Sequence, residues 1–510
     1  MKNILNKFII ASIFFSLTIV SCKLEEDPPF LSSETVFETV DGADAALNGV
    51  FEAMANYNYY SADYHHLTDF TSGLFISGKP SDRTNICKLN PLPSQNYPTN
   101  FWKAAYSVIA RANTIIANVP ADSGNDDFNN ILGIAYFLRA HTYFNLVRLY
   151  GGVPLRTEPV TSETIHMPRA TVDEVYNLII SDAEKAKEMM YDAPLQSGGR
   201  PGKLAANYLL AQVYMQLAGN DNASNYWQKA YDEAIAIYGN YSLVSSYADL
   251  WMDPSTANNN SESIFEIQYS VEHPSALVKL FTPGNAYPGK GWQRVRPNPE
   301  TIDMHSDAYP DDPRIGYTFI STYNKYPNGV MHVYPDAPRN GFMKGFPFLY
   351  KFFIKDQTAH TDATNFNFVR YRYAELLLML AEIENELHGP ANAYQYVNEV
   401  LARARNTANP PAVEPADWSG LSQDEFREKI MREYHFELLG EGDDWFVAHR
   451  RGYDFFKTHY IDVHNARIAQ DNKPYDVEYP DNTKVMLMPI PSVEINANQE
   501  ISASDQNPGY

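Results

Sequence analysis

Aromatic and polar side chains alternate in one segment near the start of the chain. Aromatic rings stack on the C–H faces of sugars and lose few rotors on binding, while polar side chains bind the hydroxyl groups. We therefore interpret the segment as a candidate platform for a neutral glycan. The alternative is that its tyrosines pack onto the rest of the protein. The residues concerned are Tyr57, Tyr59, Tyr60, Tyr64, His65, His66 and Asp69, followed by Asp82 and Arg83.

A second candidate site lies far downstream, around Trp292. This tryptophan follows a glycine in the run Lys290-Gly291-Trp292-Gln293-Arg294, outside any helical pattern. An indole beside side chains that form hydrogen bonds suits an exposed platform, with Arg294 as a bonding partner. The alternative is that Trp292 is a buried loop anchor. Three other tryptophans, on amphipathic patterns or at a helix end, are predicted to be core residues: Trp102, Trp227 and Trp445.

The motifs of common catalytic sites are absent from the sequence. It has no HExxH, no paired CxxC, no P-loop and no dinucleotide fingerprint. The carboxylates Asp122, Asp126 and Asp127 lack the ligand spacing of a calcium loop, so a structural calcium is unsupported. A glycosidase pair needs a defined separation and one raised pKa, which a sequence with 62 acidic residues cannot single out. We predict no catalytic residue, metal site or cofactor.

The N-terminus has the pattern of a secretory signal. Lys2 and Lys7 precede an apolar run, 8–20, which is shorter than the roughly 20 residues that span a bilayer. The run ends in Ile19-Val20-Ser21-Cys22, which resembles the lipobox of bacterial lipoproteins. We predict that residues 1–21 are removed, that Cys22 carries the lipid anchor, and that 22–31 forms a flexible leash.

Composition limits the other possibilities. The chain has 510 residues with 44% hydrophobic and 14% aromatic content, which excludes a disordered protein. Its formal net charge of −22 disfavours nucleic acid as a partner. Cys87 is the only cysteine besides Cys22, so a lipidated Cys22 leaves no intramolecular disulfide to stabilise the fold.

Hydrophobic periodicity predicts pairs of helices. Spacings of three and four place apolar residues on one face of each helix. In one pair, Leu210, Ala211, Tyr214, Ala223, Trp227 and Ala230 fall at tetratricopeptide-repeat offsets. A second pair repeats these offsets more weakly at Ala381, Ala393, Val397 and Val400. The predicted helices are 42–55, 101–118, 131–149, 171–190, 205–218, 223–238, 371–387, 391–405 and 423–439.

Long segments rich in Pro, Gly, Asn and Tyr separate the helices, at 56–99, 253–366 and 454–482. They are too long for simple connectors, and loops on a rigid scaffold commonly carry binding sites. We predict a mainly α fold, with a tetratricopeptide-like scaffold, long irregular loops and little β-structure. Residues 32–510 form one domain, with repeats at about 101–238 and 369–450 and ligand-binding loops at about 56–99 and 253–366. The alternative is a generic helical domain.

Motifs in a fixed order along nearly the whole chain carry a resemblance to a known family. The first lie in the predicted helices at 101–118 and 131–149 and continue to 176; later ones lie at 372–386, 437–445 and the C-terminus. They include Trp102, Tyr106, Asn113, Phe137-Leu138-Arg139-Ala140, Arg148-Leu149-Tyr150-Gly151-Gly152-Val153-Pro154, Arg372-Tyr373-Ala374-Glu375, Glu441-Gly442, Trp445, Met488-Pro489-Ile490-Pro491 and Gln506-Asn507-Pro508-Gly509-Tyr510. The chain resembles the SusD/RagB family of nutrient-binding outer-membrane lipoproteins of Bacteroidetes. Two positions depart from the family pattern, Tyr434 and Asp444, where arginines are common.

The resemblance implies a non-enzymatic protein that binds oligosaccharide. It also implies a partner, a SusC-like TonB-dependent outer-membrane barrel over which the lipoprotein sits as a lid. The acidic residues after Cys22 are similar to the export signal for the outer face of the outer membrane, so we expect a lipid-anchored protein facing outward. Three alternatives stay open: the same architecture binding peptides, a surface hydrolase, and a pure assembly scaffold.

Overall fold

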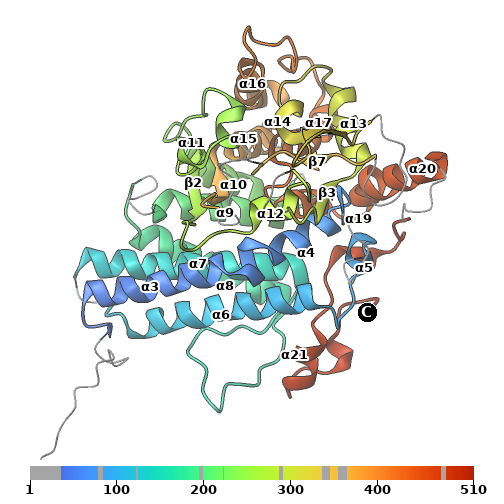
Figure 1. The fold of residues 1–510 in the computed structure, drawn as a ribbon. Helices are drawn as coiled ribbons and strands as arrows, with labels where there is room; N and C mark the ends of the chain where they lie inside the picture. Colours follow the sequence, from blue (N-terminus) through green and yellow to red (C-terminus); the bar gives the residue numbers. More distant parts are fainter. Residues whose placement is uncertain are drawn as a thin grey trace, which may run out of the picture.

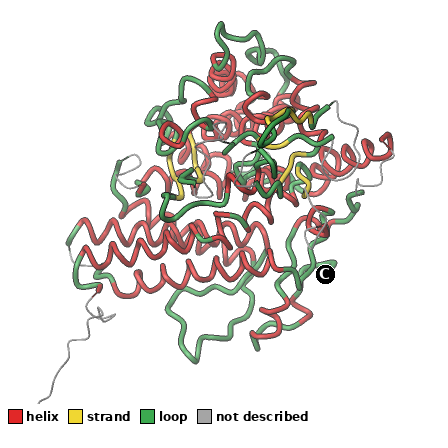
Figure 2. The backbone as a smooth tube through the Cα atoms, in the orientation of Figure 1, coloured by secondary structure: helices red, strands yellow, loops and turns green. Residues whose placement is uncertain are grey.

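The fold is mainly helical, as predicted (Figures 1 and 2). The structure is a computed structural model, and none of the helices it describes is long and apolar enough to cross a membrane. It describes residues 36–77, 84–121, 124–193, 199–221, 223–286, 291–335, 345–353, 364–471 and 478–510. The signal peptide, Cys22 and the leash at 22–31 therefore lie outside the described residues, as do Asp82 and Arg83.

Within the ranges that the structure describes, nine long helices form the scaffold, and each packs against at least one of the others. Four of them lie side by side in one layer, and the others continue above it (Figure 1). The first four are α3 (Val40–Ala55), α6 (Asn96–Asn118), α7 (Asp126–Tyr150) and α8 (Val172–Met189). The others are α9 (Lys203–Ala218), α10 (Tyr226–Ile235), α15 (Tyr373–His388), α16 (Pro390–Asn406) and α17 (Gln423–Leu438). The predicted pairs α9–α10 and α15–α16 both form, and α7 packs against α8 in the same way.

Local sequence signals set the helix ends. Thr171 begins α8 with a capping box, in which its hydroxyl accepts from the backbone N–H of Glu174 while the Glu174 carboxylate accepts from the N–H of Thr171. Between α15 and α16, Gly389 adopts a φ of 82° and Pro390 occupies the first position of the next helix. These residues make the tight reversal that the predicted helix pair requires.

The core is built from the helix faces that periodicity indicates. Trp102, Trp227 and Trp445 are at most 2% exposed, which confirms them as core residues. Ala211 and Ala230, at the repeat offsets, have no exposed surface. Small side chains at these positions let neighbouring helices approach closely, as in tetratricopeptide pairs.

The connection between α7 and α8 is a long loop below the layer (Figure 2). Gly151 ends α7 with a φ of 73°. Arg169 donates to the carbonyl oxygens of Gly152 at 2.7 Å and Tyr150 at 3.1 Å, and Asn507 from the C-terminus donates to the same Tyr150 oxygen at 2.9 Å. These motif residues therefore hold the loop and the C-terminus against the end of α7.

Short strands and helices fold the remaining segments back onto the scaffold. Within the described residues, the strands form four antiparallel two-stranded sheets. These are β1 (Phe75–Ser77) with β3 (Val295–Pro297), β2 (Ser263–Ile267) with β8 (Phe368–Arg372), β4 (Phe319–Ile320) with β7 (Phe348–Leu349), and β5 (Thr322–Asn324) with β6 (Val330–His332). The short helices are α4 (Asp63–Thr71), α5 (Thr84–Cys87), α11 (Pro254–Ala257), α12 (Leu277–Phe281), α13 (Pro299–Ala308), α14 (Ile315–Thr318), α18 (Asp444–Arg450), α19 (Tyr453–Phe456), α20 (Asp462–Asp471) and α21 (Ser492–Ala497).

The β1–β3 ladder joins the two segments predicted to carry the ligand site. It pairs Phe75 with Pro297, more than two hundred residues apart in sequence. One expectation for the first segment is corrected, because its described parts, 56–77 and 84–99, are largely helical rather than an irregular loop. It contains the π-helical turn η1 (Tyr57–Ser61), α4 and α5, and it runs into the start of α6.

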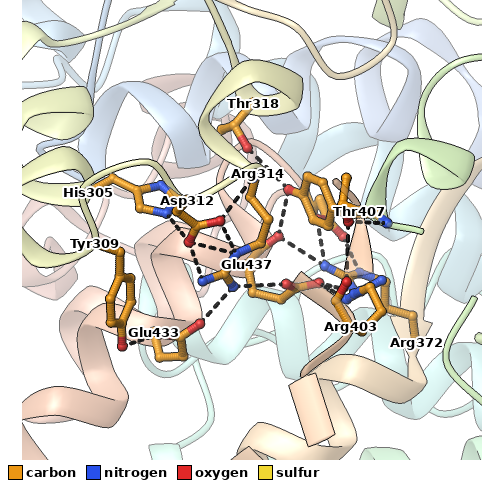
Figure 3. Close-up of polar contacts among 12 residues, drawn as sticks. His305, Tyr309, Asp312, Arg314, Thr318, Arg372, Arg403, Thr407, Glu433 and Glu437 are labelled. Atoms are coloured by element: carbon orange, nitrogen blue, oxygen red, sulfur yellow. Dashed lines mark hydrogen bonds and ion pairs between the residues drawn. The ribbon is translucent and has the colours of Figure 1, made fainter. Parts of the chain in front are cut away.

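A buried network of ion pairs fixes the upper segments to α17 (Figure 3). Its centre is Glu437, whose carboxylate pairs with Arg314 at 3.1 Å, with Arg372 at 2.8 Å and with Arg403. All four side chains are at most 3% exposed. Burial alone would raise the pKa of Glu437, but the three guanidinium groups hold it well below its usual value. The network therefore joins β8, α16 and the turn before α14 to α17 through desolvated charges.

A second buried carboxyl group, Glu375 of α15, has a raised pKa, in contrast to the lowered pKa of Glu437. Gln212 donates a hydrogen bond to it at 3.0 Å, while burial and the Asp443 charge raise its pKa from 4.5 to about 8. Between these pH values the folded protein holds a proton that the unfolded chain has released, so stability falls as pH rises. We expect Glu375→Gln, which keeps the acceptor, to raise Tm at pH 8 and to change it little at pH 4.5. An equal shift at both pH values would contradict this assignment.

Candidate functional site

Five of the residues predicted to bind ligand lie in the core. They have no exposed surface in the structure: Tyr59, Tyr60, Tyr64, His65 and Asp69. A ligand needs accessible side chains, so the prediction for these five residues is corrected. The cause is their position on η1 and α4, which pack against α6 and α18.

The contacts of these buried residues explain why they are tolerated inside. The Tyr59 ring lies 4.9 Å from the Phe101 ring, and the Tyr60 hydroxyl lies 2.5 Å from His141 Nε2. His65 Nδ1 lies 3.1 Å from the Asp69 carboxylate, and burial raises the pKa of Asp69. These contacts lower the cost of burial, although the Tyr64 hydroxyl and His65 Nε2 find no hydrogen-bond partner among the described residues.

Three other predicted residues come together at the surface: Tyr57, Trp292 and Arg294. The Tyr57 and Trp292 rings meet edge to face with centroids 6.2 Å apart. The guanidinium of Arg294 lies 4.2 Å from the Trp292 centroid, and its Nη1 donates to the Tyr57 hydroxyl at 2.7 Å. Lys279 of α12 lies 5.5 Å from the same indole. We call these four residues the aromatic platform.

Backbone bonds to α12 hold the platform tryptophan. The N–H groups of Trp292, Gln293 and Arg294 donate to the carbonyl oxygens of Lys279, Thr282 and Leu280 at 2.6, 3.0 and 2.8 Å. Glycine is required before the indole, because a Cβ on Gly291 would lie 2.3 Å from the Thr282 oxygen. The segment is therefore fixed in place before any ligand arrives, which lowers the entropic cost of binding.

The platform offers both apolar faces and oriented polar groups. Tyr57 is 39% exposed, and Trp292 and Arg294 are half-buried. The Tyr57 oxygen accepts the bond from Arg294, so its own O–H is left to donate to a ligand. The two rings can contact the C–H groups of a sugar, while the Tyr57 hydroxyl, Arg294 and Lys279 can donate hydrogen bonds to its oxygens. This combination matches the alternating C–H and O–H surface of a sugar.

Metal coordination finds no support among the residues that the structure describes. The structure contains no group of three or more His, Cys, Asp or Glu side chains placed to hold a metal ion within those ranges. Asp126 and Asp127 lie in the first turn of α7, which the Asn125 side chain caps, and Asp122 lies outside the described residues. Lys279 is a platform residue that the sequence did not indicate, since only the fold brings α12 to Trp292.

Comparison with known proteins places the chain in a family. A family model described as the SusD family matches residues 250–510, which is more than half of the chain. The chain belongs to the SusD family. A second model, described as starch-binding associating with outer membrane, matches residues 24–215.

Relatives of the SusD family match this chain along nearly its whole length. SusD-like protein P25 of Formosa agariphila is 28% identical over 98% of this chain and 99% of its own. SusD-like protein P2 of the same organism is 28% identical over 99% of this chain and all of its own. The predicted family assignment is therefore confirmed.

Solved SusD-family structures share the fold. A SusD homolog from Bacteroides thetaiotaomicron superposes with a TM-score of 0.77 at 20% identity, covering 94% of this chain and 98% of its own. A structure described as a laminarin-binding SusD-like protein has a TM-score of 0.69 at 21% identity, covering 92% and 99%. At these identities the likeness concerns the fold alone.

Proposed function

We propose that this protein is a surface-exposed glycan-binding lipoprotein that captures oligosaccharide and delivers it to a TonB-dependent outer-membrane transporter, acting as its lid. The observation that carries the proposal is the exposed aromatic platform, where Tyr57, Trp292 and Arg294 converge. Membership of a family with a laminarin-binding member supports it. Its action is capture and release, without bond cleavage.

The anchor and the partner belong to the same proposal. A lipid on Cys22 ties the protein to the membrane, and residues 22–31 act as a leash that lets the domain move over the barrel. Two or more acyl chains hold such an anchor firmly, whereas one holds only marginally. The family model that associates its members with the outer membrane supports this location.

Weak binding suits a protein that must hand over its ligand. We expect dissociation constants from micromolar to millimolar, or about −4 to −8 kcal/mol. The platform is small and half-exposed, and its rim is charged, which fits this range better than tight binding.

A calorimetric screen of the purified chain tests the proposal. We expect at least one neutral oligosaccharide to bind, with no new reducing ends on incubation, and a tagged lipoprotein to co-purify with an outer-membrane barrel. Peptide pools run in parallel. Absence of any carbohydrate binding at millimolar concentration would contradict the proposal, binding of peptides alone would favour a peptide carrier, and new reducing ends would indicate a hydrolase.

A further inference from the structure

A groove of about 740 Å³ lies along α3, outside the aromatic platform. The groove has three walls: α3, the segment 268–274, and the turn before α9. This volume is within the range of about 300 to 1,000 Å³ that is typical of small-molecule sites. The lining residues are Ala45, Asn48, Gly49, Phe51, Glu52, Ala55, Asn56, Gly199, Arg200, Gln268, Tyr269, Glu272, His273 and Pro274.

The α3 wall of the groove has small residues that leave space for a ligand and polar side chains that can form hydrogen bonds with it. Ala45, Gly49 and Ala55 are small and leave space, while Asn48 and Glu52 sit on successive turns of the same face. Across the groove, Glu272 and His273 are exposed at the rim. The wall therefore offers both donors and acceptors to a ligand, in addition to the rings of Phe51 and Tyr269.

Arg200 joins the turn before α9 to the α3 wall of the groove. Its Nη2 donates to Asp44 at 2.8 Å and to Asn48 at 2.7 Å, and its guanidinium lies 4.9 Å from the Phe51 ring centroid. Its Nη1 is buried, and none of the described residues accepts a hydrogen bond from it. An unsatisfied buried donor costs about 1–3 kcal/mol. The bonds to Asp44 and Asn48 tie the turn before α9 to α3, so these two walls of the groove are held together before a ligand arrives.

The groove and the platform are adjacent along the chain at the end of α3. Ala55 and Asn56 line the groove, and the next residue, Tyr57, belongs to the platform. On the other wall, Pro274 precedes α12, whose Lys279 lies beside Trp292. From Ala45 to Asn56 the helix rises about 16 Å, so the groove extends the site well beyond the platform.

We propose that this groove is a second binding region, which holds the continuation of a carbohydrate chain whose other end stacks on the aromatic platform. The inference rests on the proposed glycan-binding function and extends it to long chains. The occupant is a neutral chain, because Glu52 and Glu272 would repel an anionic one while their carboxylates accept from sugar hydroxyls.

Filling the groove tests the inference. Ala45 is exposed on α3, so Ala45→Trp obstructs the groove without disturbing the core. Ala391→Trp, at an exposed position of α16, is the matched control. The probes are laminari- and malto-oligosaccharides from disaccharide to octasaccharide, titrated by calorimetry. For the wild type we expect affinity to rise with chain length, and Ala45→Trp should weaken octasaccharide binding about tenfold, since the second contact acts as a linked site.

The outcomes separate this inference from the function on which it rests. Disaccharide binding should be unchanged in Ala45→Trp, and Ala391→Trp should match the wild type at every length. Glu272→Ala, which removes a rim acceptor instead of filling space, should weaken only the longer probes. Octasaccharide binding that Ala45→Trp leaves unchanged would overturn the groove while leaving the platform in place. A wild type that binds no carbohydrate at millimolar concentration, in these series or in the wider calorimetric screen, would overturn both.

Discussion

Replacing Trp292 with alanine is expected to abolish detectable glycan binding while leaving the fold intact. The indole contacts the other three members of the platform, through the Tyr57 ring, the Arg294 guanidinium and the Lys279 ammonium. Truncating a central aromatic anchor costs at least about 2 kcal/mol, or roughly thirtyfold in affinity. A ligand with a dissociation constant of about 1 mM would then bind at about 30 mM, beyond the reach of calorimetry, while one of about 1 µM would weaken to about 30 µM.

A second platform variant, Tyr57→Ala, has a matched control, because Tyr238 lies elsewhere on the scaffold and is exposed to nearly the same extent as Tyr57. Tyr238 is 37% exposed, against 39% for Tyr57, and its ring packs on Tyr373 and Tyr396. Tyr57→Ala should weaken binding and Tyr238→Ala should not. Trp292→Ala should unfold at nearly the wild-type Tm, because the indole is only half-buried. Full affinity in Trp292→Ala would show that the ligand binds elsewhere.

Loss of the carboxylate at Glu437 is expected to destabilise the fold by about 3–5 kcal/mol, since it leaves buried guanidinium groups without their shared partner. Glu437→Gln keeps the size of the side chain but removes the charge that Arg314, Arg372 and Arg403 face (Figure 3). Denaturant unfolding at neutral pH measures the change. Because the network joins β8 and α16 to α17, loss of the Glu437 charge should also weaken the packing of these elements on one another.

An exposed ion pair provides the comparison for Glu437. Asp417 pairs with Arg405 at 2.7 Å but is 58% exposed, so Asp417→Asn should change stability by no more than about 1 kcal/mol. The sign of the pH dependence gives a second check. The depressed pKa of Glu437 means that its contribution is complete above the ordinary glutamate value and is lost as pH falls through the folded value. The gap between wild type and Glu437→Gln should therefore narrow in acid. Equal effects of Glu437→Gln and Asp417→Asn would refute the network's role.

The helical scaffold was largely predictable from the sequence, because helix formation is signalled locally. Periodicity placed the ninth scaffold helix at 423–439, and the structure has Gln423–Leu438. Capping by Thr171 and the Gly389-Pro390 break mark helix ends through short-range geometry. The burial of the first ligand segment was harder to predict, because α4 contains many polar residues although all of its side chains are buried. His65 and Asp69, four residues apart, form a pair that makes their burial possible.

The sequence alone determined where helices run, which tryptophans are core residues and which family the motifs resemble. It also selected Tyr57, Trp292 and Arg294 as candidates for the ligand site. Only the tertiary structure decided that Tyr57 faces outward while Tyr59, Tyr60 and Tyr64 face inward. The reason is that exposure depends on which distant elements pack on each side of η1 and α4, and the Arg294–Tyr57 contact joins residues 237 positions apart. No local pattern encodes a partner at that separation.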